Sequence, residues 1–274
     1  EGRHVSTRKG YSRRVDIPAD LLHRLNRGLE ETRTLVEWLA VDLAELLQTA
    51  CLDVGLHDER DGLVATANDL ASEGVMARTI GMSNAIGRAV RERSDGEHVT
   101  HALAAHTSDV VRAWACYMPL GDASLTFADR LGLARPFASD PNQNVREGAW
   151  GALRPTILND PPLAIAALEP WVADADANIR RCAVEATRPC GVWTRHIRLL
   201  KREPDVASHL LEPVRSDPSR YVQTAVANWL NDASKTCPEW VTDLTDRWLR
   251  ESDTPETAWT VNHARRTLRK RGLA

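Results

Sequence analysis

A polar turn followed by an apolar–polar pair recurs along the chain, and this repeat constrains the fold more than any other feature. The pairs are Val111-Arg112, Val145-Arg146, Ile179-Arg180 and Val222-Gln223, and the preceding turns contain Asp109, Asp140, Asp174 and Asp217. Successive pairs are 34, 34 and 43 residues apart. Periods of this length are typical of stacked helix pairs that bury their apolar faces against their neighbours. No stretch alternates apolar and polar residues as a half-buried strand would, so an all-α fold is expected.

The details of the repeat favour one type of helix pair. A period of 34 residues would suit tetratricopeptide repeats, but their Trp, Gly and Tyr positions are absent. An Asp turn followed by Val-Arg at the start of a second helix is typical of HEAT-like repeats. The sequence therefore predicts an all-α, right-handed solenoid of HEAT-like helical repeats, with a last helix at about 257–270.

The beginning of the chain has a different composition. The first 16 residues have no apolar period and contain several basic residues among Ser, Thr and Gly, namely Arg3, Arg8, Lys9, Arg13 and Arg14. This composition predicts a flexible basic arm over residues 1–16. From residue 17 onward the pattern is helical, so a single repeat domain is predicted over residues 17–274.

Composition places the chain among ordinary globular proteins. It is 43% hydrophobic and 27% charged, and no run is long and apolar enough for a membrane span. The five cysteines are widely spaced, with no C-x-x-C pair and no histidine at zinc-ligand spacing. A reducing, cytoplasmic setting therefore fits best. We also expect a monomer, associated with the nucleoid, with no metal, no other cofactor and no membrane partner.

Charge is distributed unevenly between the two halves. Residues 178–274 contain 17 Lys and Arg against 12 Asp and Glu, a balance of +5. Since the whole chain carries −3, the first 177 residues carry −8. An anionic partner is therefore expected to bind the C-terminal half.

One helix of the repeat carries a group of charged residues. Asp176 and Asn178 are typical of a helix start and Pro189 of a helix end. The apolar positions in between, Ile179, Cys182, Ala183 and Ala186, follow the spacing of a buried stripe. The opposite face then contains Arg181, Glu185 and Arg188. In a single helix this pattern is usually a solvated surface.

Alignment across repeats changes that interpretation, because the second helices of a solenoid stand side by side. The corresponding face holds Glu147, Trp150 and Arg154 in the preceding repeat, Asn228, Asn231 and Asp232 in the following one, and His263, Arg266 and Lys270 in the last helix. Carboxylates, amides, guanidiniums and indoles would therefore converge on one groove, which predicts a functional surface.

Several segments resemble one known family, the AlkC/AlkD-like DNA glycosylases among the DNA alkylation repair proteins, and within them the AlkC branch. These segments are Leu25–Gly28, Leu35–Asp42, Ser108–Ala115, Asn178–Arg181, Glu185–Pro189 with Trp193, and Tyr221-Val222 leading to Val226–Lys235. The resemblance implies excision of cationic N-alkylated bases from double-stranded DNA by a monofunctional glycosylase in base excision repair. It also implies that Glu185, Asp232, Arg181 and Trp193 correspond to active-site positions.

The chemistry of this reaction suits those residue types. An N-alkylated base is positively charged and leaves readily, while the sugar develops oxocarbenium character. A carboxylate near that carbon can stabilise the positive charge or orient the attacking water, and Glu185 and Asp232 can divide these tasks in either order. Arg181 and Arg188 are expected to hold flanking phosphates and Trp193 to pack on the sugar or base. The further DNA-binding candidates are Trp150, Arg154, His263, Arg266 and Lys270, with Glu147 and Asn228 as auxiliary residues.

One position departs from the family pattern. Relatives commonly carry a further Glu four residues before the Arg-Pro of the preceding repeat, where this chain has Trp150. The indole could offer a flat surface to a larger adduct. Two alternatives therefore stay open, namely a self-resistance glycosylase for bulky alkylating natural products and, from another class, a non-catalytic HEAT-repeat scaffold that binds DNA or protein.

Overall fold

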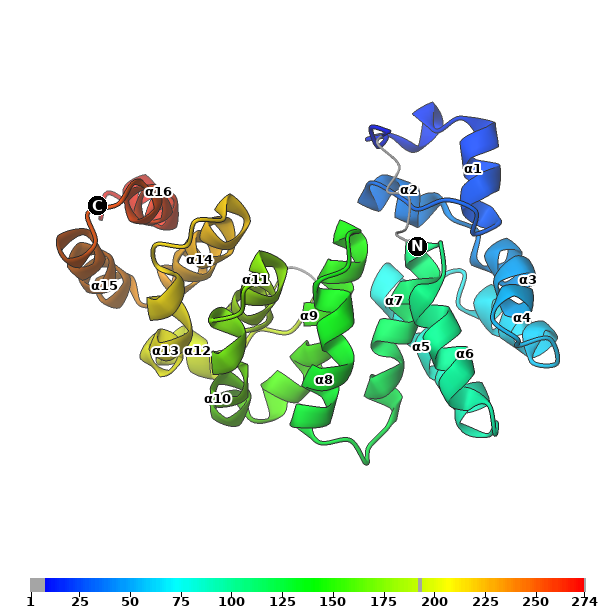
Figure 1. Ribbon diagram of the computed structural model, residues 1–274. Helices are drawn as coiled ribbons and strands as arrows, with labels where there is room; N and C mark the ends of the chain where they lie inside the picture. Colours follow the sequence, from blue (N-terminus) through cyan, green and yellow to red (C-terminus); the bar gives the residue numbers. More distant parts are fainter. Residues whose placement is uncertain (1–7, 192–193, 274) are drawn as a thin grey trace. The chain divides into compact units, whose positions relative to one another are not determined.

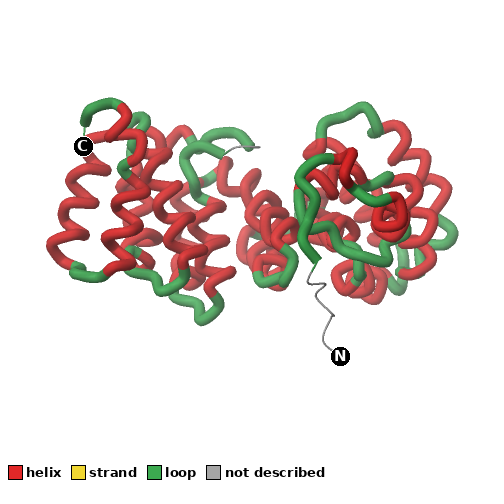
Figure 2. The backbone as a smooth tube through the Cα atoms, turned by 90° about the horizontal axis from the view of Figure 1, so that it is seen from above, coloured by secondary structure: helices red, strands yellow, loops and turns green. Residues whose placement is uncertain are grey.

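The computed structural model describes residues 8–191 and 194–273, and all regular structure in these ranges is helical (Figure 2). The predicted all-α fold of stacked helix pairs is confirmed. The chain divides into two compact units, Glu1–Ala152 and Leu153–Ala274, where the sequence predicted one domain over 17–274. Within the described ranges, no helix has both the length and the apolar character that crossing a membrane requires.

The first unit consists of helices joined by turns and loops, coloured blue to green in Figure 1. Its α-helices are α1 (Ala19–Asn26), α2 (Leu35–Ala40), α3 (Leu43–Asp53), α4 (Arg60–Asp69), α5 (Val75–Arg91), α6 (Gly96–Ala105), α7 (Asp109–Tyr117), α8 (Phe127–Ala138) and α9 (Gln143–Asn159), with 3-10 turns η1 (Arg14–Asp16) and η2 (Met118–Gly121). Helix α9 continues seven residues past the boundary between the units. Helix α7 packs against both α5 and α6.

In the second unit, second helices of neighbouring repeats pack side by side. Its α-helices are α10 (Pro161–Val172), α11 (Ala177–Ala186), α12 (Arg198–Arg202), α13 (Ser208–Leu211), α14 (Arg220–Ala233), α15 (Pro238–Glu251), α16 (Pro255–Ala264) and α17 (Arg266–Lys270), with 3-10 turns η3 (Pro204–Ala207) and η4 (Glu212–Val214). Helix α14 packs between α11 and α16 (Figure 1), as predicted for second helices of neighbouring repeats. The helix predicted at 257–270 is divided into α16 and α17 at Arg265.

The predicted basic arm contacts the rest of its unit from residue 8 onward. The Arg8 guanidinium donates to Glu30 and Glu37 at 2.6 and 2.7 Å, and the Tyr11 backbone N–H donates to Glu37 at 2.8 Å. Arg8 is thereby held by carboxylates. The segment from Arg8 onward is therefore in contact with the first unit, while Arg3 lies outside the described residues.

The turn aspartates explain why the repeat recurs in the sequence. Asp140, Asp174 and Asp217 each accept a hydrogen bond at 2.8 Å from the backbone N–H two residues on, which starts the next helix. The side chain six positions after each aspartate donates a hydrogen bond to the backbone carbonyl of that aspartate. The donors are Arg146, Arg180 and Gln223. The repeat motif is thus a closed turn-to-helix unit.

Two of the arginines also join neighbouring repeats. Arg180 forms a two-point contact with Asp217 of the following turn, at 2.6 and 2.9 Å, and Arg112 does the same with Asp140 at 2.9 and 3.1 Å. Since Asp140 and Asp217 are buried, each contact compensates a carboxylate that water does not solvate. These pairs fix the stacking of one repeat on the next.

The first repeat uses a histidine where the others use aspartate. His106 lies six residues before Arg112, and its Nδ1 accepts the Ser108 backbone N–H at 2.9 Å. The assignment of Asp109 to this turn was wrong: Asp109 is buried and instead accepts hydrogen bonds from the backbone and hydroxyl of Thr32. Burial raises the pKa of Asp109, against the lowering effect of these hydrogen bonds.

Candidate active site

Helix α11 carries the first predicted catalytic carboxylate, Glu185. Its core stripe is as predicted, because Ile179, Cys182, Ala183 and Ala186 are all buried. In a single helix the opposite face would be solvated, but here Arg181 and Glu185 are only 7% and 6% exposed. The neighbouring helix α14 accounts for this burial in part, since the Arg181 guanidinium lies 4.6 Å from the centre of the Tyr221 ring.

Helix α14 carries the second predicted carboxylate, Asp232, near its C-terminal end. The Trp229 side chain on the same helix donates its indole N–H to the backbone carbonyl of Thr187 at 3.0 Å. This bond ties the end of α11 to α14. Asp232 is 2% exposed, so it too is buried rather than facing water.

Arg188 joins the two carboxylates. Its Nη1 donates to Glu185 Oε2 at 3.2 Å, while Nε and Nη2 lie 2.9 and 2.8 Å from Asp232 Oδ2. Burial lowers the pKa of Arg188, but the two carboxylates raise it more, and the result is a raised pKa. The sequence-predicted residues Glu185, Arg188 and Asp232 are therefore brought together as one charged cluster.

Two further cations complete the cluster. Arg181 Nη2 lies 3.7 Å from Glu185 Oε1, and Lys235 Nζ donates to Asp232 Oδ1 at 2.6 Å. Lys235 was not a candidate from the sequence. Its position three residues after Asp232 in the sequence could have indicated the contact.

Arg154 has a structural position instead of the predicted contact with DNA. Its side chain is 1% exposed and donates to the backbone carbonyls of Ala186 at 2.8 Å and Arg195 at 3.1 Å. Burial, assisted by the nearby Arg188, lowers the pKa of Arg154 to about 10. This arginine satisfies the carbonyl at the end of α11 and so supports the helix that carries Glu185.

The residues predicted on the last helix lie on and after α16. Arg266 Nη2 donates to Asn228 Oδ1 at 2.8 Å, and burial, assisted by Arg188, lowers its pKa. His263 stacks on Trp259 with ring centres 3.7 Å apart, and Arg220 lies 3.8 Å from the centre of the Trp259 ring. Lys270 is exposed. Asn228 is thus a support for Arg266, while Lys270 keeps an accessible ammonium.

The remaining predicted residues lie elsewhere. Trp150 and Glu147 belong to the first unit, where the Trp150 indole N–H donates to Glu147 Oε2 at 2.7 Å. Trp150 is 9% exposed, which leaves little of the ring available for an adduct and argues against the flat wall that the sequence suggested. Trp193 lies outside the described residues.

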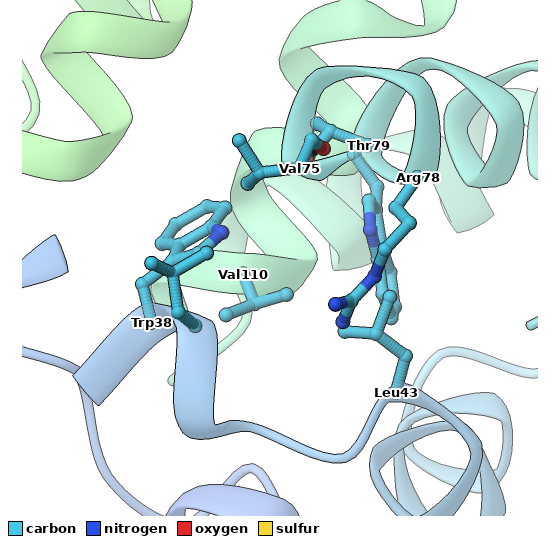
Figure 3. A pocket seen from close by; sticks show the side chains of 8 residues that line it. Trp38, Leu43, Val75, Arg78, Thr79 and Val110 are labelled. Atoms are coloured by element: carbon cyan, nitrogen blue, oxygen red, sulfur yellow. Dashed lines mark hydrogen bonds between the residues drawn. The ribbon is translucent and has the colours of Figure 1, made fainter. Parts of the chain in front are cut away.

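The first unit also contains a small apolar pocket between α2, α3, α5 and α7 (Figure 3). Its lining includes Trp38, Leu43 and Val110, and Arg78 extends from α5 toward Leu43. None of the predicted site residues lines it. The residues predicted from the sequence therefore lie in the charged cluster and not in this pocket.

Comparison with known proteins gives a consistent result. Residues 147–268 match the sequence model of the family described as DNA alkylation repair enzyme. The uncharacterized protein YhaZ of Bacillus subtilis (strain 168) is 40% identical over 121 residues, which are 44% of this chain and 33% of YhaZ.

Two solved structures share the fold. One is the Pseudomonas fluorescens alkylpurine DNA glycosylase AlkC bound to DNA containing an abasic site analog, with 27% identity and a TM-score of 0.72, covering 84% of this chain and 64% of that chain. The other, smu.31 from Streptococcus mutans UA159, has 17% identity and a TM-score of 0.52, covering 80% and 98%, and supports the fold alone.

Stacked helix pairs, with a buried carboxylate–guanidinium cluster on adjacent second helices, define a helical-repeat protein whose fold is similar to that of AlkC. The part of the chain that carries this cluster lies within residues 147–268, which match the DNA alkylation repair enzyme family model. The resemblance seen in the sequence is therefore confirmed.

Proposed function

We propose that this protein is a DNA glycosylase that hydrolyses the N-glycosidic bond of bases carrying a cationic N-alkyl group. The observation that carries the proposal is the meeting of Glu185 and Asp232 on adjacent second helices, within the segment that matches the repair family. A scaffold has no need for two buried carboxylates at one place. Burying a carboxylate costs free energy, because the buried charge loses its hydration.

The cluster can supply what the reaction requires. A cationic base needs no protonation to leave, so the barrier lies in the positive charge that develops on the sugar. A carboxylate in a site that largely excludes water stabilises that charge more than one in bulk water. The second carboxylate can orient or deprotonate the attacking water. Either Glu185 or Asp232 suits either task, since both are buried and both contact Arg188.

The proposed partner is double-stranded DNA containing an alkylated base, bound by a monomer in the cytoplasm. AlkC, the similar structure, is bound to DNA containing an abasic site analog. The basic balance of residues 178–274, which lie within the second unit, supports contact of that segment with an anionic partner.

The assay that tests the proposal uses duplexes that each carry one defined adduct, such as 3-methyladenine, 3-methylcytosine or a bulky aromatic alkyl group. Released base and abasic sites are measured separately. We expect release of the small cationic bases and intact abasic strands. Borohydride treatment tests the monofunctional assignment, because a lyase would be trapped covalently on DNA and a simple hydrolase would not.

The result also separates the alternatives. Release of bulky adducts alone would favour the self-resistance glycosylase, which the burial of Trp150 does not support. Tight binding of duplex without release of any base would indicate the non-catalytic scaffold.

A further inference from the structure

Arg188 occupies the space between the two carboxylates of the proposed active site. Its guanidinium lies within 3.2 Å of Glu185 and within 2.9 Å of Asp232. It follows the end of α11, and 16% of its side chain is exposed, against 7% for Glu185 and 3% for Asp232. The Arg188 side chain is therefore more exposed to solvent than the two carboxylates that it contacts.

The other carboxylate oxygens also face cations. Arg181 lies 3.7 Å from Glu185 Oε1, and Lys235 lies 2.6 Å from Asp232 Oδ1. The attraction between a carboxylate and a developing sugar cation weakens when a guanidinium already compensates the carboxylate. This step rests on the proposed function. The paired arrangement of Glu185 and Asp232 in the free protein must consequently change before the carboxylates can act on a substrate.

DNA offers Arg188 another partner. A guanidinium forms two-point contacts with phosphate as well as with carboxylate. DNA brings both a phosphate, which can take the guanidinium, and an alkylated base, whose positive charge can take its place between the carboxylates. We infer that Arg188 is a positioning residue that bridges Glu185 and Asp232 in the free protein and exchanges this bridge for a DNA phosphate in the complex. The carboxylates then become available only when DNA is bound.

The exchange can be observed directly by NMR of the arginine side chains in the wild-type protein. The Nε–H signal of Arg188 is assigned as the one missing in Arg188→Lys. Titration with a lesion-free duplex should shift this signal, while the Nε–H of Arg180, which donates to buried Asp217, stays in place as an internal control. An Arg188 signal that is unchanged at saturating duplex overturns the inference. Because no base is excised, this result is independent of the proposed catalytic activity.

The salt dependence of DNA binding by Arg188→Ala gives a second test. We expect weaker binding to lesion-free duplex and a plot of log K against log salt that is flatter by about 0.9, the value for one lost phosphate contact. The Arg188→Lys variant should keep the salt slope, because an ammonium can contact a phosphate but does not span two carboxylates.

Arg250→Ala is the matched control, because Arg250 is an exposed arginine on α15 outside the cluster. An unchanged salt slope for Arg188→Ala would show that Arg188 does not contact a phosphate in the complex and would overturn the exchange. If Arg188→Ala does not fold, Arg188→Lys and the NMR titration decide the question.

Discussion

At the scale of single residues, the main feature is that both proposed catalytic carboxylates are buried and paired. Glu185 and Asp232 share one guanidinium, and each has a second cation beside it. Removing one member of such a cluster affects both the charge that remains and the stability of the fold. Substitutions of the two carboxylates must therefore keep the size and shape of the side chain.

Glu185→Gln and Asp232→Asn keep shape and remove charge. We expect each to lower single-turnover excision by about two to four orders of magnitude, the range for losing a charge-stabilising or base residue. Each should also lower the free energy of unfolding by about 1–3 kcal/mol, because a charged hydrogen bond to Arg188 becomes a neutral one. Excision is measured on a 3-methyladenine duplex and stability by urea unfolding monitored by circular dichroism.

Glu239→Gln is the control for these variants, since Glu239 is an exposed glutamate at the start of α15. It should change neither the rate nor the stability measurably. Excision near the wild-type rate by both cluster variants would contradict the assignment of catalytic roles.

At the scale of elements, the repeat depends on one turn that is closed by a side-chain acceptor. Aspartate closes this turn at positions 140, 174 and 217, and His106 closes it before α7. Burial lowers the pKa of His106 below its usual 6.5, and Arg112 also lowers it, while Asp53 acts in the opposite direction. The folded protein therefore favours the neutral ring, whose Nδ1 can accept a hydrogen bond.

This histidine predicts a pH dependence of stability for the first unit. Because the folded pKa lies below the unfolded one, the unfolded state binds the proton more readily. The stabilisation is complete above about pH 6.5 and is lost as the pH falls through the folded pKa, by at most about 1.4 kcal/mol per pH unit. Thermal unfolding between pH 7.5 and 5.5, about one unit either side of the usual pKa, should show this fall.

His106→Asn tests the cause, because an asparagine side chain accepts the same backbone N–H without titrating. We expect its unfolding temperature to vary less with pH than that of the wild type over this interval. Equal slopes for the two proteins would mean that other groups produce the pH dependence.

At the scale of the whole molecule, basic residues are not equivalent as contacts for DNA. Lys270 is exposed at the end of α17, whereas Arg154 is buried and occupied by two backbone carbonyls. Only an accessible cation can release counterions from a phosphate. The second unit therefore contains both accessible cations and structural ones, and the sequence does not distinguish them.

Lys270→Ala and Arg154→Ala should separate these two roles. Lys270→Ala is expected to flatten the plot of log K against log salt for lesion-free duplex by about 0.9, with no change in stability. Arg154→Ala should leave the slope unchanged and lower the free energy of unfolding by about 1–3 kcal/mol, because the carbonyl of Ala186 loses its donor. A change of slope in Arg154→Ala and not in Lys270→Ala would mean that Arg154, and not Lys270, contacts a phosphate.

The sequence by itself determined the features that depend on neighbours along the chain. The helix pairs follow from apolar periodicity, and the recurrent turns follow from an aspartate that accepts a backbone N–H only two residues away. The buried stripe of α11 was predicted for the same reason. His106 was missed because a motif search for aspartate does not recognise another acceptor in the same position.

Tertiary structure alone decided how the charged residues are used. Spacing on a helix shows which residues point away from that helix's own core stripe, but not whether the next repeat covers them. Packing of α14 against α11 covers Glu185 and brings Arg188 to Asp232, which is 44 residues distant in the chain. The same kind of long-range contact makes Arg154 a structural residue, with its Nη1 on the carbonyl of Ala186, 32 residues away. Burial and pairing are properties of distant segments in contact, and these contacts set whether a carboxylate is solvated, compensated or available for chemistry.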